Sequence, residues 1–304
     1  MKLSIIVPVY NIDKYVTQCL DSIVPQLTNE VELIMVNDGS TDNCGTIIEQ
    51  ITKGNPFCKI IYKNNGGLGS ARNVGLLNAT GEFIWFVDGD DEIDKNAINT
   101  FFENYPCISA SDIIFFSTLH RRLDTDVLRL ENKLIDLVDV NVYEFLAKME
   151  IMPVTAWCFF YKKSFLQIYS LRFEEGILHE DNEFMLRVYN KVSKVSSIAR
   201  TLYIYKAREG SIMKSKVNSK KILSVFKIIE TCLFLKPDQL KKETLDNQLY
   251  WFINWYLEII KCSDDKIFYQ RKLYQLVKRQ KIYRSDPIGM IKNKIVYNLF
   301  KIYI

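Results

Sequence analysis

The sequence predicts an α/β protein with an open, doubly wound, mostly parallel (Rossmann-like) sheet, followed by a helical C-terminal extension. Short runs rich in Ile, Val and Phe alternate with amphipathic segments over the first part of the chain, which is the pattern of buried parallel strands joined by helices. Beyond residue 215 the chain becomes helical and rich in aromatic residues. The predicted domains are therefore 1–215, composed of the halves 1–118 and 119–215, and a basic helical extension, 216–304.

The individual elements follow from these runs in order. Five strands are predicted in the first half, at Leu3–Val9, Val31–Val36, Lys59–Tyr62, Phe83–Val87 and Asp112–Phe116. The amphipathic segments between them predict helices at Asp13–Leu27, Asn43–Lys53, Leu68–Asn78 and Lys95–Glu103. The second half is mixed, with strands predicted at Thr155–Tyr161 and Thr201–Lys206 and helices at Val142–Met149 and Asp181–Asn190.

Composition narrows the class of protein. The 304 residues are enough to bury a full core. The seven cysteines are scattered and odd in number, without a C-x-x-C pair, which argues against a zinc site and against a disulfide framework. A cytoplasmic location is expected from this cysteine usage. No stretch reaches ~18 unbroken apolar residues, so a spanning helix is not expected. A signal peptide is not expected either, because Pro8 ends the N-terminal apolar run and no small-residue cleavage site follows.

Charge is distributed unevenly along the chain. The net charge is +4, but residues 266–304 carry ten Lys or Arg and one acid, so this segment is +9 and the remainder is −5. Apolar residues are interleaved with these bases, a pattern that suits a helix lying on an anionic membrane surface. A solvated basic face on a helical domain explains the same pattern. Nucleic acid is not an expected partner, since the segment has no recognised binding motif.

The most informative stretch is Asp88-Gly89-Asp90-Asp91, directly after an apolar strand. Carboxylates packed this closely repel one another, and a divalent cation removes that cost. Oxygen-only ligands suit Mg²⁺ or Mn²⁺. The alternative is a solvated acidic turn that caps the next helix.

Three other strands also end in polar residues, near Asn11, Asp38 and Asn65. In open α/β sheets, ligands bind outside the carboxyl ends of the strands, so these ends are expected to converge on one site. Asp38 is expected to accept hydrogen bonds from a base or a ribose, although a helix-capping turn explains the Gly, Ser, Thr and Asp that surround it.

Two cationic stretches are candidates for binding an anion. The turn before Arg72 contains Gly67-Leu68-Gly69 but lacks the third glycine of a dinucleotide fingerprint, so Arg72 is expected to pair with a phosphate or with the carboxylates. Lys206 ends a predicted strand and Arg208 lies in the turn after it, and both are expected to face a diphosphate. In both stretches an ordinary solvated surface residue is the competing interpretation.

The stretch His179-Glu180-Asp181 opens a predicted helix. Asp181 is a candidate general base, although acids in the first turn of a helix are also favoured by the helix dipole alone. His179 is not assigned the base role, because a lone histidine is more often structural.

Taken together and in this order, these stretches resemble the inverting, non-processive bacterial glycosyltransferases of family 2, which have the GT-A fold. The resemblance covers residues 3 to 212. The matching pieces are Ser4–Asn11, Val36–Asp42, Asn65–Gly75, Phe86–Asp91, His179–Phe184 and Tyr205…Ser211-Ile212. The Gln-x-x-Arg-Trp motif of processive members is not found, which argues for transfer of one sugar at a time.

The resemblance implies a role for each matching residue. Pro8, Tyr10 and Asp38 would line the nucleoside pocket, with Asp38 on the uracil, and Asn11, Asn65 and Gly89 would also bind the donor. Arg72 would lie near the diphosphate or the sugar, and Asp88 near the ribose or the metal. Asp90 would bind Mn²⁺ or Mg²⁺, and Asp181 would be the catalytic base. Lys206 replaces the arginine of many relatives, and its flexible point charge is a less rigid phosphate ligand than the arginine fork.

The implied reaction is metal-dependent, inverting transfer of one sugar from a nucleotide-sugar, UDP-linked, to a glycan hydroxyl. The acceptor would be a lipid-linked intermediate of bacterial surface polysaccharide, handled at the inner face of the cell membrane. Two other hypotheses remain at this point. One is a nucleotidyltransferase on a similar fold, which would carry a Gly-rich loop with Arg and Lys after the first strand, where Tyr10-Asn11 stands. The other is a non-catalytic, membrane-associated binding protein.

Overall fold

The computed structural model describes residues 1–121, 128–130, 135–149, 152–207 and 216–279. The chain divides into two compact units: Met1–Gly176 with Glu180–Ser211, and Ile177–His179 with Ile212–Ile304. Each is described by itself, and the domain boundaries given above stay predictions. Arg208 and the basic segment beyond residue 279 lie outside the described residues.

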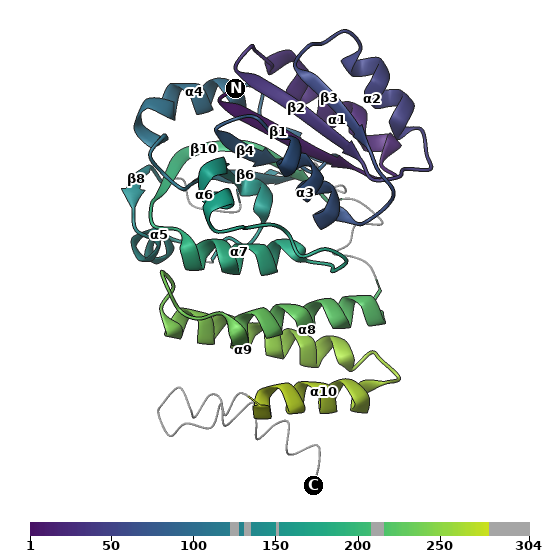
Figure 1. Cartoon of the computed structure of the whole chain (residues 1–304), viewed down its shortest axis with the longest axis vertical. Helices are drawn as coiled ribbons and strands as arrows, with labels where there is room; N and C mark the ends of the chain where they lie inside the picture. Colours follow the sequence, from purple (N-terminus) through teal and green to yellow (C-terminus); the bar gives the residue numbers. More distant parts are fainter. Residues whose placement is uncertain (122–127, 131–134, 150–151, 208–215, 280–304) are drawn as a thin grey trace. The chain divides into compact units, whose positions relative to one another are not determined.

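The first unit is built on one mixed sheet with strand order β3-β2-β1-β4-β9-β6-β10-β5 (Figure 1). Four of its strands come from the predicted βα repeats: β1 (Leu3–Val9), β2 (Val31–Asn37), β3 (Cys58–Tyr62) and β4 (Phe83–Phe86). They pair in parallel, with β1 between β2 and β4. Their carboxyl ends therefore lie along the same edge of the sheet, as predicted.

Helices connect these strands. They are α1 (Asp13–Ile23), the short 3-10 helix η1 (Val24–Gln26), α2 (Cys44–Thr52), α3 (Leu68–Asn78) and α4 (Ala97–Ile108). Gly75 of α3 lies against β1, where an added Cβ would stand 2.3 Å from the Cγ2 atom of Ile6. The absence of a side chain at Gly75 lets α3 approach the sheet closely, and α3 carries Arg72.

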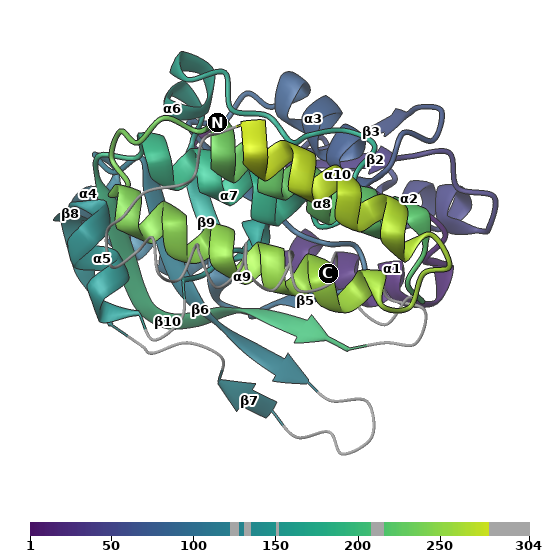
Figure 2. The same cartoon turned by 90° about the horizontal axis from the view of Figure 1, so that it is seen from below.

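The second half of the first unit extends the same sheet. The strands β6 (Ile113–Arg121) and β10 (Val195–Lys206) run side by side and parallel, as Figure 2 shows. The short strands β5 (Glu92–Ile93), β7 (Leu128–Leu130) and β8 (Leu137–Val140) pair antiparallel to them. The remaining helices are α5 (Val142–Lys148), α6 (Lys163–Ile168) and α7 (Glu180–Lys191).

The predicted strand Thr155–Tyr161 is wrong in its first part. Ala156–Cys158 form the 3-10 helix η2, and the strand is β9 (Phe159–Lys162), which lies antiparallel between β4 and β6. Within this turn the carbonyl of Trp157 accepts a hydrogen bond from the indole Nε1 of Trp85, at 3.0 Å. The carbonyl of Trp157 therefore accepts its hydrogen bond from a side chain and not from a neighbouring strand.

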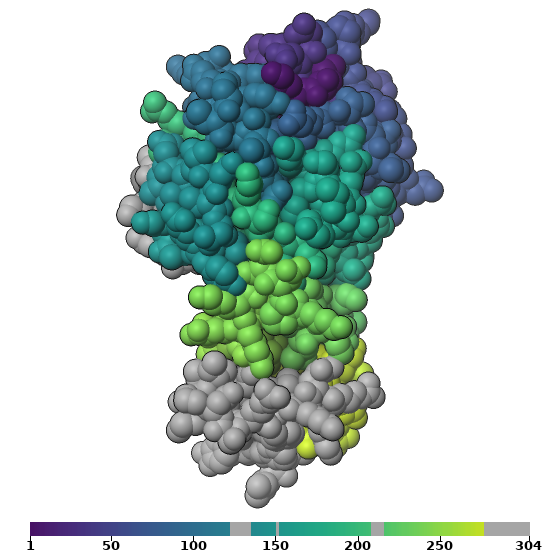
Figure 3. Space-filling model, turned by 60° about the vertical axis from the view of Figure 1, so that its left-hand side comes forward, coloured from purple at the N-terminus to yellow at the C-terminus, as the bar shows by residue number. Residues whose placement is uncertain are grey.

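Aromatic side chains form much of the core where the two halves of the sheet meet. Trp85 of β4 is fully buried, with its ring centre 4.9 Å from that of Phe160 and 5.3 Å from that of Phe116. Figure 3 shows the two halves of this unit, purple to blue and teal, packed without a gap on the face in view. This packing fixes β4, and residues 88–91 follow one residue after the end of that strand.

The second unit is helical, which confirms the predicted extension. It contains α8 (Ser219–Phe234), α9 (Lys242–Ile260) and α10 (Lys266–Arg279). In the described part of the chain, no helix is both long enough and apolar enough to cross a membrane.

Candidate active site

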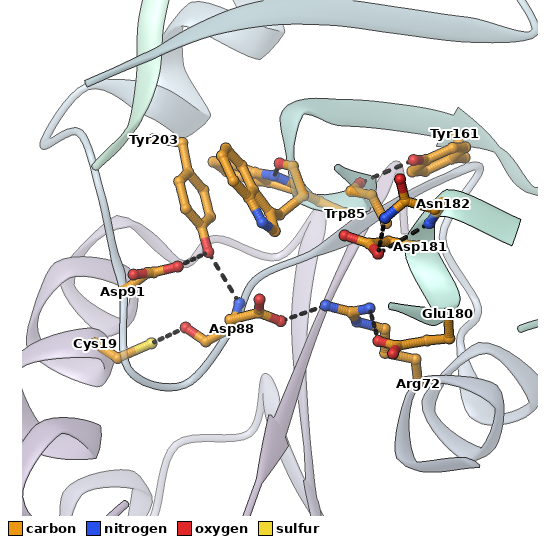
Figure 4. Close-up of polar contacts among 12 residues, drawn as sticks. Cys19, Arg72, Trp85, Asp88, Asp91, Tyr161, Glu180, Asp181, Asn182 and Tyr203 are labelled. Carbon is orange, nitrogen blue, oxygen red and sulfur yellow. Dashed lines mark hydrogen bonds and ion pairs between the residues drawn. The ribbon is translucent and has the colours of Figure 1, made fainter. Parts of the chain in front are cut away.

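Arg72 lies at the centre of the candidate site. Its Nη2 atom is 2.6 Å from a carboxylate oxygen of Asp88, and its Nη1 atom is 2.8 Å from one of Glu180 (Figure 4). The residue is 1% exposed, and its guanidinium also lies over the ring of Phe173 at 5.1 Å. Arg72 therefore joins three segments: α3, the turn after β4, and the start of α7. The predicted pairing of Arg72 with carboxylates is seen in these two contacts, and its role near a diphosphate or sugar stays a prediction.

Asp181 stands beside this bridge, in the first turn of α7. Its Oδ1 atom accepts hydrogen bonds from the backbone N–H and the side-chain amide of Asn182, at 2.9 and 3.1 Å. Burial raises the pKa of Asp181 and the charge of Asp88 adds to the rise, whereas Arg72 opposes it. A carboxylate with a raised pKa holds a proton more strongly, which is the property required of a general base at near-neutral pH.

Glu180 was not predicted as a site residue. It is 3% exposed, and burial raises its pKa to about 7, while Arg72 opposes the rise. Arg72 and Glu180 are 108 positions apart in the chain, so spacing gives no signal for their pairing. The one available signal is that an ionisable Glu directly precedes the candidate base.

The turn after β4 arranges its three carboxylates differently. Asp88 is bound to Arg72, whereas Asp91 is buried and both of its oxygens accept hydrogen bonds from β10. Burial, followed by the charges of Asp90 and Asp88, raises the pKa of Asp91 well above its ordinary value. Asp90 is half-buried at the same turn. Gly89 lies against β1, because an added Cβ would stand 2.9 Å from the carbonyl oxygen of Pro8.

This donor set fits a divalent cation. Mg²⁺ is commonly held by one or two carboxylates together with water and substrate phosphates. The metal ligand that the resemblance implies is Asp90, which lies in this turn between Asp88 and Asp91, and its role stays a prediction. Burial, followed by the charges of Asp91, Asp90 and Asp88, raises the pKa of the nearby Cys19 thiol well above its ordinary value. No group of three His, Cys, Asp or Glu side chains in the described ranges could hold a metal by itself, so the other ligands of a cation there would be water or substrate oxygens.

Beyond the end of β2, Asp38 holds the glycine-rich turn through its hydrogen bonds. Its carboxylate accepts hydrogen bonds from the backbone N–H groups of Gly66 and Gly67, at 2.9 and 2.8 Å, and from the ammonium of Lys63 at 2.5 Å. The amide of Asn65 donates to the Asp38 carbonyl at 3.1 Å. Asp38 is 2% exposed, and its carboxylate is already bonded within the protein. Its contact with uracil stays a prediction. Lys63, half-buried beside it, was not predicted.

The end of β1 supplies the other donor-side candidates. Pro8 is buried within β1, whereas Tyr10 is 47% exposed at its end. Asn11 has a φ of 50°, a conformation that asparagine tolerates better than most residues. Its side-chain oxygen accepts a hydrogen bond from the Thr41 N–H at 2.8 Å, which links the ends of β1 and β2.

Lys206 is directed toward acidic and amide groups. Its ammonium forms an ion pair with Glu92 and donates to the side-chain oxygen of Gln18 at 2.7 Å. The structure therefore does not present Lys206 as an unpaired cation, and its phosphate role stays a prediction. His179, in the second unit, packs on Trp255 with ring centres 4.8 Å apart, and burial followed by Lys221 lowers its pKa to about 4.

Comparisons with known proteins identify the family of this chain. The family model for glycosyl transferase family 2 matches residues 4–138. GlyG of Streptococcus pneumoniae is 31% identical over 262 residues, which cover 78% of this chain and 82% of GlyG. GlyA of the same organism is 33% identical over 70% of this chain, and EpsJ of Bacillus subtilis is 31% identical over 69% of it. The chain spans only 32% of the length of GlyA and 62% of that of EpsJ.

Solved structures show the same fold. The crystal structure of Staphylococcus aureus TarS residues 1–349 in complex with UDP-GlcNAc aligns with a TM-score of 0.65 and 24% identity, covering 93% of this chain and 79% of TarS 1–349. This likeness confirms the predicted GT-A fold. With the motifs in order, the fold matched and GlyG covered over most of its length, this chain belongs to glycosyltransferase family 2.

Proposed function

We propose that this protein is a metal-dependent, inverting glycosyltransferase that moves one sugar from a UDP-sugar to a hydroxyl group of a glycan acceptor. The observation that carries this proposal is the Arg72 bridge. It holds Asp88, beside the candidate metal ligand Asp90, in one cluster with the start of α7, where the candidate base Asp181 lies. A donor diphosphate and an acceptor hydroxyl need these two kinds of group close together.

The donor side of the proposal rests on two features. Asp38, Lys63 and the Gly66–Gly67 amides form an ordered turn at the strand ends, suited to a nucleoside. Asp90 would hold Mn²⁺ or Mg²⁺, whose charge would stabilise the diphosphate as it leaves. A UDP-sugar is proposed because TarS has been solved with UDP-GlcNAc and with UDP.

Asp181 is proposed to act on the acceptor. As the acceptor oxygen bonds to the anomeric carbon, its proton would pass to the Asp181 carboxylate, and the bond from that carbon to the diphosphate oxygen would break. A single displacement of this kind needs one base and inverts the anomeric centre, so an α-linked donor gives a β-glycoside. Arg72 and Glu180 would hold the first turn of α7 in place during this step.

The acceptor is proposed to be a lipid-linked intermediate of bacterial surface polysaccharide. Support comes from the bacterial relatives, which include poly(ribitol-phosphate) β-glucosyltransferase of Bacillus spizizenii, 32% identical over 70% of this chain. TarS is likewise named for transfer to poly(ribitol-phosphate). The family assignment favours this reaction class over the nucleotidyltransferase alternative.

We also propose that α10 docks on an anionic membrane surface. Ile267 and Phe268 are 63% and 60% exposed there, and Arg271 is exposed on the same helix. Exposed apolar residues beside bases are the pattern of an interfacial helix.

The metal proposal predicts that UDP release from a UDP-sugar needs Mn²⁺ or Mg²⁺. Asp90→Asn should raise the Mn²⁺ concentration for half-maximal release by at least ~10-fold, because it removes the ligand charge. The assay is UDP release across a panel of nucleotide sugars, with each metal and with chelator. Asp94→Asn, in the same acidic stretch, is the matched control. Undiminished UDP release in chelator would refute the metal role.

The base proposal predicts that Asp181→Asn lowers kcat by ~10²- to 10⁴-fold. Because the folded-state pKa of Asp181 is raised, ionising it at neutral pH costs folding free energy, so Asp181→Asn should unfold no earlier than the wild type. Activity of the wild type should fall as the pH drops through this raised pKa, above the ordinary range of an aspartate. Glu144→Gln, another first-turn helix acid, is the control. If Asp181→Asn transferred the sugar at the wild-type rate, Asp181 could not be the base.

The membrane proposal predicts sedimentation of the protein with vesicles that contain phosphatidylglycerol, weakening as salt rises. Phe268→Ser should reduce this binding. Trp251→Ser removes a residue on α9 that is 55% exposed and serves as the control. Equal binding to neutral vesicles, or equal loss in both variants, would contradict a basic interfacial face on α10.

A further inference from the structure

The hydroxyl of Tyr203 connects the two ends of the acidic turn. Tyr203 lies on β10 and is fully buried. Its hydroxyl accepts a hydrogen bond from the backbone N–H of Asp88 at 3.2 Å and donates one to the Asp91 carboxylate at 2.6 Å (Figure 4). One phenol group can fill both roles at once. The residue between these two contacts that carries a side chain is Asp90.

Asp91 is held by β10 at both of its oxygens. Besides the Tyr203 hydroxyl, the backbone N–H of Lys206 donates to the other oxygen at 2.8 Å. The turn is closed by a third bond, from the Asp91 N–H to the Asp88 carbonyl, at 3.0 Å. The turn on both sides of Asp90 is therefore held by contacts with a strand more than a hundred residues later in the chain.

The phenol itself is fixed by stacking. The ring of Tyr203 lies 4.5 Å from that of Trp157, with an angle of 12° between the planes. Trp157 is held in turn through its carbonyl by the indole of Trp85. Both supporting residues belong to the aromatic core, so the hydroxyl cannot shift without disturbing that packing.

From this geometry we propose that Tyr203 is a positioning residue for the cation–nucleotide site. Its hydroxyl fixes Asp88 and Asp91 so that Asp90, and not Asp91, is presented to the metal and the donor diphosphate. This inference rests on the proposed function of the Asp88–Asp91 turn. Tyr203 itself touches neither substrate nor metal in this account. It acts through the backbone N–H of Asp88 and the carboxylate of Asp91, which lie before and after Asp90 in the turn.

Tyr203→Phe tests the proposal, because it keeps the ring on Trp157 and removes only the hydroxyl. Outer-sphere changes of this kind weaken metal binding by ~10- to 100-fold, and a loss in that range is expected for Mn²⁺ at saturating UDP. Free Mn²⁺ can be followed by its electron paramagnetic resonance signal with the full chain. UDP binding in chelator, measured by calorimetry, should stay near the wild-type value.

Tyr189→Phe is the matched control. Tyr189 is also fully buried, and its hydroxyl donates to the carbonyl of Pro153 at 2.6 Å, so its loss removes a comparable hydrogen bond elsewhere in the same unit. Unchanged Mn²⁺ affinity in Tyr203→Phe, or an equal loss in Tyr189→Phe, would overturn the positioning role.

Asp91→Asn provides a second variant in case Tyr203→Phe does not fold. An amide there can no longer accept hydrogen bonds at both positions, so the same weakening of Mn²⁺ binding is expected, and wild-type affinity would refute the proposal. If the wild type fails to bind Mn²⁺ with UDP at all, the proposed function fails and this inference falls with it. Wild-type binding with undiminished binding by the variants overturns the inference alone.

Discussion

The site depends above all on the buried guanidinium group of Arg72. Moving the Arg72 guanidinium out of water is costly, and only close, hydrogen-bonded carboxylates offset that cost. Asp88 and Glu180 provide them, at 2.6 and 2.8 Å, from two segments that lie far apart in the sequence. The same two bonds that stabilise Arg72 therefore determine where the acidic turn and the first turn of α7 lie relative to each other.

The surrounding fold explains why this arrangement is rigid. Parallel pairing brings the ends of β1, β2 and β4 to one edge, and Gly75 allows α3 to approach closely enough to deliver Arg72. From the other half of the sheet, β10 holds the acidic turn through Tyr203 and the Lys206 N–H. Under the proposed function, this turn is where the divalent cation would bind together with the donor diphosphate.

Much of this could be predicted from the sequence, because strand ends and polar turns are local signals. The four βα repeats, the acidic turn after β4 and the acids that open α7 all follow from neighbouring residues. The pairing of Arg72 with Glu180 and the contacts of Tyr203 could not be predicted, since they depend on tertiary packing between distant segments. Asp38 shows the same limit: its position was predicted, but its bonds to the Gly66 and Gly67 amides depend on the conformation of the turn. The sequence could not predict that β9 lies antiparallel beside β4 either, because a short apolar run does not indicate with which strand, or in which direction, it pairs.

The central claim is that Arg72 joins Asp88 and Glu180 into one energetic unit, and a double-mutant cycle tests it most directly. The free energy of unfolding in urea would be measured for the wild type, Asp88→Asn, Glu180→Gln and the double variant. Each single change leaves Arg72 one carboxylate partner, whereas the double change leaves neither of the two. The account therefore predicts that the double variant loses more than the sum of the single losses, by ~0.5 to 3 kcal/mol. Additive losses, within ~0.5 kcal/mol, would show that the two carboxylates are independent and would contradict the account.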